Sequence, residues 1–132
     1  MSLIYAANTN PQATLATGTI VNFGSAVRKS GCKIGISGGN VYVAGKGYYD
    51  LDTNVTFIAT GAGTATMTLY KDGVAIPGAT QTVTTTAAGA SIFSIPAIVR
   101  QNCCCETSIT AEVVGAGSIT NAAIMVANYE ND

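Results

Sequence analysis

Residues 45–78 constrain the fold more than any other part of the chain, because apolar and polar residues alternate there with a period of two. The apolar positions lie on both sides of a Gly61-Ala62-Gly63 break: Val55, Phe57, Ala59, Ala65, Met67 and Leu69. Such alternation predicts β-strands with one buried face. Asp72-Gly73 is a hairpin signal, since both central positions of a type I′ turn need positive φ, and Pro77-Gly78 is a further turn signal. The segment therefore predicts two antiparallel strands and the start of a third, and it carries no catalytic motif.

The length of 132 residues predicts one domain, 1–132, with N-terminal strands within 1–31 and the core of the fold within 32–132. Charged residues make up 10% of the chain, against about a quarter in ordinary soluble domains. The surface is therefore expected to be mostly neutral, which favours an oligomer or a larger assembly. A monomer with a hydroxyl-rich surface is the alternative.

The charge pattern and the lengths of the apolar runs exclude two classes of protein. The six basic residues are scattered along the chain and form no stripe that could follow a phosphate backbone, so nucleic acid is not expected as a partner. The first residues lack the charged start and long apolar run of a secretory signal, and no later run approaches the length of a membrane span. The sequence therefore predicts neither a nucleic-acid-binding protein nor a membrane protein.

Short strand patterns occupy most of the remaining chain, and no segment carries an apolar stripe of helical period. The further predicted strands are 3–7, 14–23, 32–37 paired with 40–44 as a hairpin, 80–86, 91–99, 107–114 and 119–129. The threonine-rich 80–86 segment suits an edge or outer strand, and Pro96 indicates an edge or a bulge in 91–99. Eight to ten short strands with turn signals predict an all-β fold, a β-sandwich or jelly roll.

The last predicted strand, 119–129, is apolar on both faces. One face carries Ala123, Met125, Ala127 and Tyr129, and the other carries Ile124 and Val126. Such a strand is either central and covered on both sides, or it packs one face on the core and the other on a neighbouring subunit. The pattern alone leaves both alternatives open.

The chemistry that most enzymes need is missing. No histidine is present, which removes the commonest general base and the usual partner of a nucleophilic Ser or Cys. Asp50 and Asp52 share a strand face, so a carboxylate pair or a calcium site is conceivable, but a solvated face is favoured. We therefore expect no catalytic residue, no cofactor-binding residue and no metal ligand, and hence no enzyme.

The cysteines are unusual in their spacing, because Cys32 stands alone and Cys103, Cys104 and Cys105 are consecutive. This spacing does not match the C-x-x-C pattern of metal sites. The favoured interpretation is free thiols used as small apolar residues. The leading alternative is a disulfide from Cys32 to the triplet, and a soft metal held at a symmetry axis is a third.

Three runs, 43–51, 55–59 and 69–78, resemble the central strands of bacterial and phage members of the TNF-like, complement globular-head jelly-roll superfamily. Members of that branch carry a Gly-Tyr-Tyr strand, here Gly47-Tyr48-Tyr49, followed by an apolar alternating strand. A hairpin follows with Lys or Asn, Gly, Val, any residue, Ile or Val, Pro and Gly, which matches the run from Lys71 to Gly78. The resemblance extends from about residue 34 to the closing strand 122–129.

The resemblance implies a jelly roll of about ten antiparallel strands that assembles as a homotrimer, with aromatic and apolar residues of the inner sheet meeting at the three-fold axis. The candidate interface residues are Tyr48, Tyr49, Met125 and Tyr129. The stalk-bearing members have a collagen tract, and this chain contains no Gly-X-Y repeat. The implied function is a structural protein of a phage or prophage virion, such as a capsid decoration, head fibre or tip module.

The alternative function is a bacterial or spore-surface head domain that binds a ligand through its loops. The expected partners are other copies of this chain, other virion or surface proteins, and a glycan in the second case. The expected location is the virion, assembled in the host cytoplasm, or the cell or spore surface.

Overall fold

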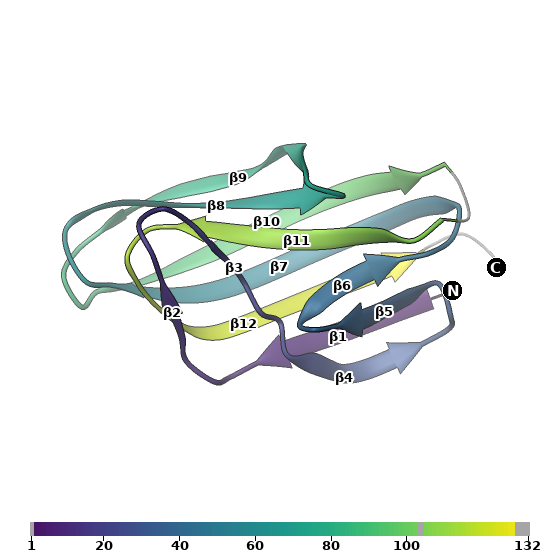
Figure 1. Ribbon diagram of the computed structural model, residues 1–132, viewed down its shortest axis with the longest axis horizontal. Helices are drawn as coiled ribbons and strands as arrows, with labels where there is room; N and C mark the ends of the chain where they lie inside the picture. The colour runs from purple at the N-terminus through teal and green to yellow at the C-terminus, as the bar shows by residue number, and fades with distance from the viewer. Residues whose placement is uncertain (1, 103–104, 129–132) are drawn as a thin grey trace.

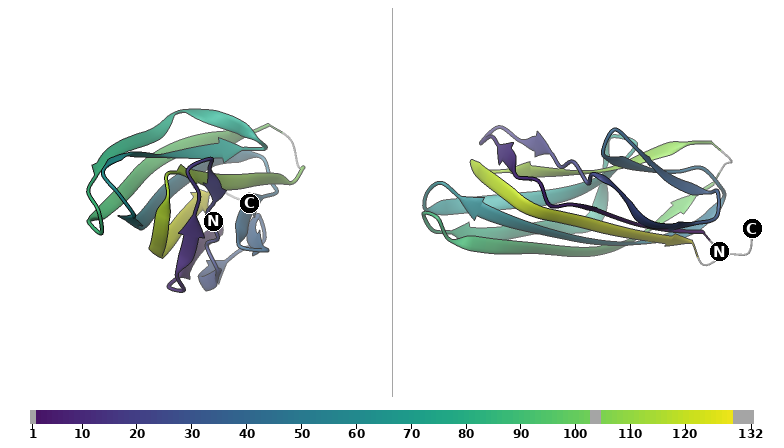
Figure 2. Two further views of the ribbon diagram at one scale, coloured as in Figure 1. Left: turned by 60° about the vertical axis from the view of Figure 1, so that its left-hand side comes forward. Right: turned by 90° about the horizontal axis from the view of Figure 1, so that it is seen from below.

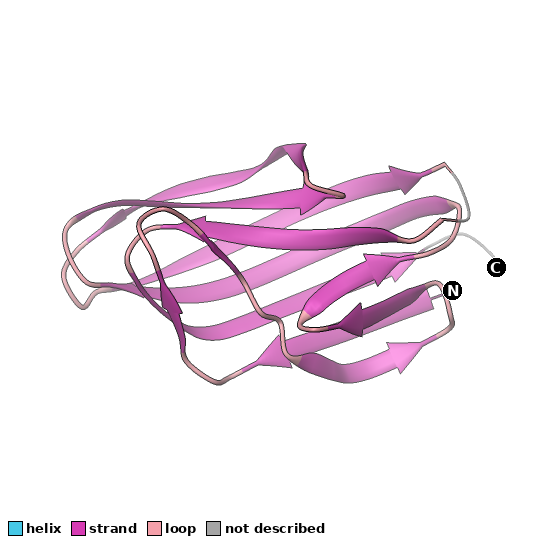
Figure 3. Cartoon of the chain, viewed as in Figure 1, coloured by secondary structure: helices cyan, strands magenta, loops and turns pink. Residues whose placement is uncertain are grey.

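A computed structural model describes residues 2–102 and 105–128 of the chain. These residues form twelve β-strands and no helix, as the secondary-structure colouring shows (Figure 3). Among them there is accordingly no helical segment long and apolar enough to span a membrane. The predicted all-β class is confirmed, and the strand number exceeds the predicted ten because several strands are only two to four residues long.

The strands follow one another along the chain with short connections. The first six are β1 (Ser2–Asn8), β2 (Gln12–Thr14), β3 (Thr19–Ile20), β4 (Ser25–Ser30), β5 (Ile34–Ser37) and β6 (Asn40–Val43). The last six are β7 (Gly47–Ala59), β8 (Gly63–Lys71), β9 (Val74–Thr85), β10 (Ala90–Gln101), β11 (Thr107–Val114) and β12 (Gly117–Asn128).

Two antiparallel sheets pack face to face as a sandwich. Sheet I has the order β10-β7-β12-β1-β4, with β2 beside β12, and sheet II has the order β5-β6-β11-β8-β9, with β3 beside β11. The two layers are visible when the molecule is turned toward its end (Figure 2, left). Both described ends of the chain, at β1 and β12, lie in sheet I, where the two strands are paired along their length (Figure 1).

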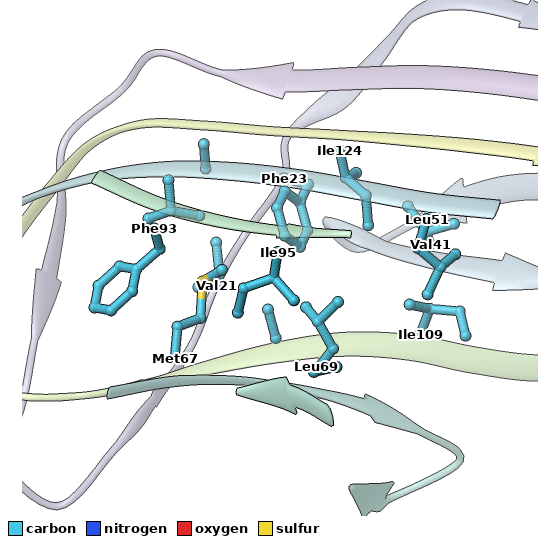
Figure 4. Close-up of a cluster of buried hydrophobic side chains, with 14 of the residues drawn as sticks. Val21, Phe23, Val41, Leu51, Met67, Leu69, Phe93, Ile95, Ile109 and Ile124 are labelled. Atoms are coloured by element: carbon cyan, nitrogen blue, oxygen red, sulfur yellow. The ribbon is translucent and has the colours of Figure 1, made fainter. Parts of the chain in front are cut away.

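The core fills the space between the sheets with apolar side chains from both layers (Figure 4). Its largest fully buried members include Phe23, Phe57, Phe93, Leu51, Met67, Leu69, Ile109 and Ile124. The rings of Phe57 and Phe93 lie 6.1 Å apart at an interplanar angle of 48°, within the range of favourable aromatic pairs. Full burial of each such side chain stabilises the fold by about 1.5–3 kcal/mol.

The two predicted tight hairpins are confirmed. Lys71 pairs with Val74 across Asp72-Gly73, whose φ angles are 51° and 80°. Ser37 pairs with Asn40 across Gly38-Gly39, whose φ angles are 60° and 82°. Positive φ at both central positions is the type I′ geometry, which matches the twist of the flanking strands.

The strands on either side of the Gly61-Ala62-Gly63 break do not pair with each other. β7 lies in sheet I between β10 and β12, whereas β8 lies in sheet II between β11 and β9. The glycine-rich break is therefore a crossing between layers and not a hairpin. Alternation with period two shows that each strand has a buried face, but it does not identify the neighbouring strand.

The edge strands include one that the sequence pattern did not predict. β10 and β9 are edges, as Pro96 and the threonine-rich segment indicated. β4 forms the opposite edge of sheet I, and all six of its residues are exposed. Because neither face of β4 is covered by the core, its sequence shows no apolar alternation.

Candidate functional site

The outer face of sheet I, which points away from sheet II, gathers apolar side chains on two adjacent strands, the central β12 and its neighbour β1. Ile4 and Ile124 point into the core, so the alternate residues of β1 and β12 point outward. We call the outward group the outer apolar patch; it consists of Leu3, Tyr5, Ala7, Ala123 and Met125. Tyr5 is 41% exposed, and the other four are half-buried. Figure 2 (right) shows β1 and β12 side by side.

The strand register aligns the patch with charged residues on both sides. Met125 lies opposite Tyr5 of β1 on one side and opposite Asp52 of β7 on the other. Tyr5 in turn lies opposite Arg28 of β4. An apolar centre with charged residues at its margins has the composition of a protein interface, with a dry core and a polar rim.

The position of β12 excludes one of the two alternatives for its doubly apolar sequence, coverage of both faces within the described chain. β12 is central in sheet I, and Ile124 and Val126 are fully buried in the core. Met125 lies on the opposite face, where no element of the described chain forms a further layer over sheet I. The strand is therefore central in its sheet but covered on one side only.

The neighbouring tyrosines of β7 have opposite environments, because successive side chains of a strand alternate between faces. Tyr49 is fully buried, and its hydroxyl donates a hydrogen bond of 2.7 Å to the carbonyl of Gly45. Tyr49 is therefore a core residue of one chain, which corrects its place among the candidate interface residues. Tyr48 is 49% exposed on the outer face, and the Arg100 guanidinium carbon lies 5.5 Å from its ring centroid. Tyr129 lies outside the described residues.

The cysteines differ from both sequence-based interpretations. Cys32 is free and exposed in the turn between β4 and β5, so the predicted bridge from Cys32 to the triplet is wrong. Cys105 is disulfide-bonded, so the favoured interpretation of four free thiols is also wrong. Cys103 and Cys104 lie outside the described residues. The side-chain amide of Gln101 donates to the Cys105 carbonyl at 2.7 Å, which ties the loop after β10 to the strand end.

The carboxylates of β7 belong to no group of described side chains that could hold a metal ion. Asp50 and Asp52 point to the outer face of sheet I, where Asp50 lies opposite Ile98 and Asp52 opposite Pro96 on β10. Within the described part of the chain, no three His, Cys, Asp or Glu residues are grouped in a way that could hold a metal ion.

A groove of about 450 Å³ lies where the start of β9 meets the end of β10. Its walls include Lys71, Asp72, Val74, Ile76, Pro77, Ile98 and Arg100. A smaller hollow of about 160 Å³ lies beside the Gly61-Ala62-Gly63 crossing. The sequence did not predict the groove, because its walls come from edge strands of different sheets whose juxtaposition is set by the packing of the two layers.

No family model and no curated protein matches the chain. Solved structures do match it in fold. The globular domain of zebrafish complement 1qA has a TM-score of 0.75 at 9% identity, covering 100% of both chains. Murine APRIL at pH 5.0 has a TM-score of 0.73 at 15% identity, covering 94% of this chain and 97% of that one. Eiger TNF from S. frugiperda has a TM-score of 0.70 at 11% identity, covering 100% of this chain and 96% of that one. The chain therefore has the TNF-like jelly-roll fold.

Proposed function

We propose that this chain is a non-enzymatic structural module of a phage or prophage virion, and that it assembles as a homotrimer through the outer apolar patch. The virion location, as a capsid decoration, head fibre or tip, is the finer part of the proposal. The patch is the observation that carries the trimer. It presents Tyr5, Met125 and their small apolar neighbours on two adjacent strands of sheet I without a covering layer.

The surface chemistry supports assembly in preference to catalysis. Apolar area left in water costs roughly 25 cal/mol per Å², so a patch of this kind is stabilised when another copy covers it. The absence of histidine and the low charged fraction leave little acid–base chemistry for an enzyme. A rigid two-layer sandwich with a mostly neutral surface is suited to a repeated structural position in a particle.

The alternative is a ligand-binding head domain on a bacterial or spore surface. The groove at the start of β9 favours this alternative, because it provides a concave site lined by apolar and charged side chains. The fold likeness to the globular domain of complement 1qA is compatible with it. In that case a glycan or a protein of the surface would be the partner.

The trimer is tested by sedimentation of the wild-type chain and two charged variants. We expect the wild type to sediment at about three times the chain mass of 13.3 kDa. Met125→Lys places a cation in the patch and should give monomers. Thr82→Lys is the matched control, because it places the same charge on the outer face of sheet II, and it should remain trimeric. A monomeric wild type, or equal behaviour of the two variants, would refute the interface.

The virion assignment is tested separately by the genes beside this one and by mass spectrometry of purified particles. Capsid, portal or tail genes in the neighbourhood and peptides of this chain in the particles are the expected results. A sporulation or surface-protein neighbourhood, with the chain absent from particles, would favour the surface head domain instead.

A further inference from the structure

The outer face of sheet II carries a row of polar side chains on its central strand, β11. Every second residue of β11 is buried, from Thr107 to Val113. The residues between them, Ser108, Thr110 and Glu112, therefore point outward. Ser108 is exposed, and the other two are half-buried. The row extends for about 13–14 Å along the strand, and it lies on the opposite face of the sandwich from the outer apolar patch.

A tyrosine lies on each side of this row. Tyr42 of β6 is paired with Ser108, and Tyr70 of β8 is paired with Thr110. The strands β6, β11 and β8 are neighbours in sheet II (Figure 1). Directly opposite residues of antiparallel strands share a face of the sheet, so both tyrosines also point outward. We call the two tyrosines and the three residues of β11 the tyrosine lane.

The Tyr42 side chain lies across the neighbouring strand β5. Gly35 of β5 is paired with Tyr42, and it is buried although it lies on the outer face. A Cβ on Gly35 would overlap the hydroxyl oxygen and the Cζ atom of Tyr42. The ring therefore occupies the space that a side chain at position 35 would fill, and its outer side forms part of the surface.

The hydroxyls of the lane differ from those of the threonine pairs on the same face. In two threonine pairs of β8 and β9, the hydroxyl oxygens lie 3.0 Å and 3.3 Å apart and bond to each other. The hydroxyls of Tyr42, Ser108 and Thr110 have no hydrogen-bond partner in the described part of the chain. The Tyr70 hydroxyl donates to one carboxylate oxygen of Glu112 at 3.4 Å. The lane thus offers unpaired hydroxyls beside a carboxylate whose position is fixed by a neighbour.

The charge of the lane limits the class of ligand. It holds one carboxylate, from Glu112, and no cation. An exposed aliphatic side chain, Ile20, lies at the Glu112 end of the lane. A protein partner would need an apolar centre, which the lane itself lacks. An anionic ligand would be repelled by the carboxylate. A neutral ligand that is rich in hydroxyl groups matches the lane best.

We propose that the tyrosine lane binds a neutral oligosaccharide, with one sugar ring packed on Tyr42 and its hydroxyls bonded to Ser108, Thr110 and Glu112. The C–H groups on the face of a sugar ring pack on an aromatic ring, and its hydroxyls donate and accept hydrogen bonds. The strands of sheet II fix the spacing of the binding residues before the ligand arrives. The site consists of residues from one chain, so it does not rest on the trimer or on the virion assignment.

The site is tested first on the wild-type protein by NMR titration with three neutral hexasaccharides: cellohexaose, chitohexaose and isomaltohexaose. At least one should bind and shift the backbone amide signals of Tyr42, Ser108 and Thr110. The signals of Thr84, on the same face but outside the lane, and of Asp52, on sheet I, should not shift. If none of the three sugars binds, or if the shifts lie outside the lane, the proposal is wrong.

The role of the tyrosine ring is tested with three variants and the neutral hexasaccharide that binds best. Tyr42→Ala removes the ring and should weaken binding at least about tenfold. Tyr42→Phe keeps the ring over Gly35 and should stay within about threefold of the wild type. Thr82→Ala removes a hydroxyl of the same face outside the lane and should bind as the wild type does. Equal affinity of Tyr42→Ala and Thr82→Ala would overturn the proposal.

Two further measurements do not depend on the folding of Tyr42→Ala. Gly35→Ala keeps the ring but places a methyl group where the ring lies, so it should weaken binding severalfold. Hexagalacturonate, an anionic hexasaccharide, should bind the wild type at least about tenfold more weakly than the best neutral hexasaccharide. Unchanged affinity of Gly35→Ala, or an anionic sugar that binds as tightly as the neutral one, would contradict the proposed site.

Discussion

The outer faces of the two sheets differ sharply although their inner faces build one common core. On sheet II, threonines of β8 lie opposite threonines of β9 in three successive pairs: Thr64 with Thr84, Thr66 with Thr82 and Thr68 with Thr80. The hydroxyls of the second and third pairs lie 3.0 Å and 3.3 Å apart. On sheet I, the outer face of β1 and β12 instead holds Tyr5 opposite Met125.

The difference agrees with the proposal that sheet I meets other copies of the chain while sheet II meets water. A threonine pair satisfies part of its hydrogen bonding across the strands and the rest with solvent, while its β-branched side chain suits a strand. The Tyr5 hydroxyl can bond to water, but the Tyr5 ring and the Met125 side chain cannot, and the exposure of their apolar area has a hydrophobic cost. The same sandwich therefore presents one face with paired hydroxyls and one face with an apolar patch, which the proposed trimer would cover.

The largest effect is expected when the apolar residues on the outer face of sheet I are replaced by threonines like those of sheet II. Replacing both Tyr5→Thr and Met125→Thr should convert the proposed trimer to monomers, since each large side chain contributes about 1.5–3 kcal/mol when fully buried. The circular dichroism spectrum should not change, because both residues lie outside the core. Size-exclusion elution of the variant and the wild type at equal concentration measures the effect. An unchanged elution volume would show that the patch is not the interface.

The second prediction is that the two neighbouring tyrosines of β7 contribute differently to the free energy of unfolding. Tyr49→Phe removes the buried hydroxyl that donates to the Gly45 carbonyl and should lower the free energy of unfolding by about 1–2 kcal/mol. Tyr48→Phe, one residue away on the outer face, should change it by less than about 0.5 kcal/mol. Urea denaturation at one fixed chain concentration compares the two variants. Equal losses would contradict the assignment of Tyr49 to the core and Tyr48 to the surface.

The third prediction is a small gain in the free energy of unfolding from a change on the inner face of β7. Thr53 is fully buried, and its hydroxyl has no hydrogen-bond partner among the described residues. Thr53→Val keeps the shape and removes the unsatisfied group, so the free energy of unfolding should rise by about 1 kcal/mol. Thermal unfolding measures the change, and a lower melting temperature would indicate that the hydroxyl has a partner in the folded protein.

The smallest effect on stability is expected on sheet II. Replacing Thr66→Val and Thr82→Val removes one exposed hydroxyl pair and should change the free energy of unfolding by about 0.5 kcal/mol or less. The solubility of the protein should fall, because the solvent-adapted face becomes apolar. Precipitation with ammonium sulfate compares the variant with the wild type. Unchanged solubility would weaken the distinction between the two faces.

The sequence predicted the fold class and much of the local structure, because both depend on neighbouring residues. The Asp72-Gly73 and Gly38-Gly39 turns follow from turn chemistry, and the buried apolar residues of β7 and β8 follow from alternation. β4 was missed because an edge strand exposed on both faces has no buried set of residues to alternate. The separation of β7 and β8 into different sheets was missed because alternation does not encode strand neighbours.

The candidate site was predicted only in part, because alternation does not show which residues lie side by side on neighbouring strands. Met125 was identified from the two apolar faces of its strand, and Tyr48 and Tyr49 from a family pattern that does not distinguish the two faces. Tyr5 was missed, because its importance comes from its position opposite Met125 in the sheet. The groove at Ile98 was missed because it depends on contacts between edges of different sheets.

The central claim is that the outer face of sheet I is covered by other copies of the chain. Multi-angle light scattering coupled to size exclusion, over a range of concentrations, tests it most directly. We expect a uniform mass of about three times 13.3 kDa across the peak. A uniform mass of one chain at all concentrations would contradict the claim.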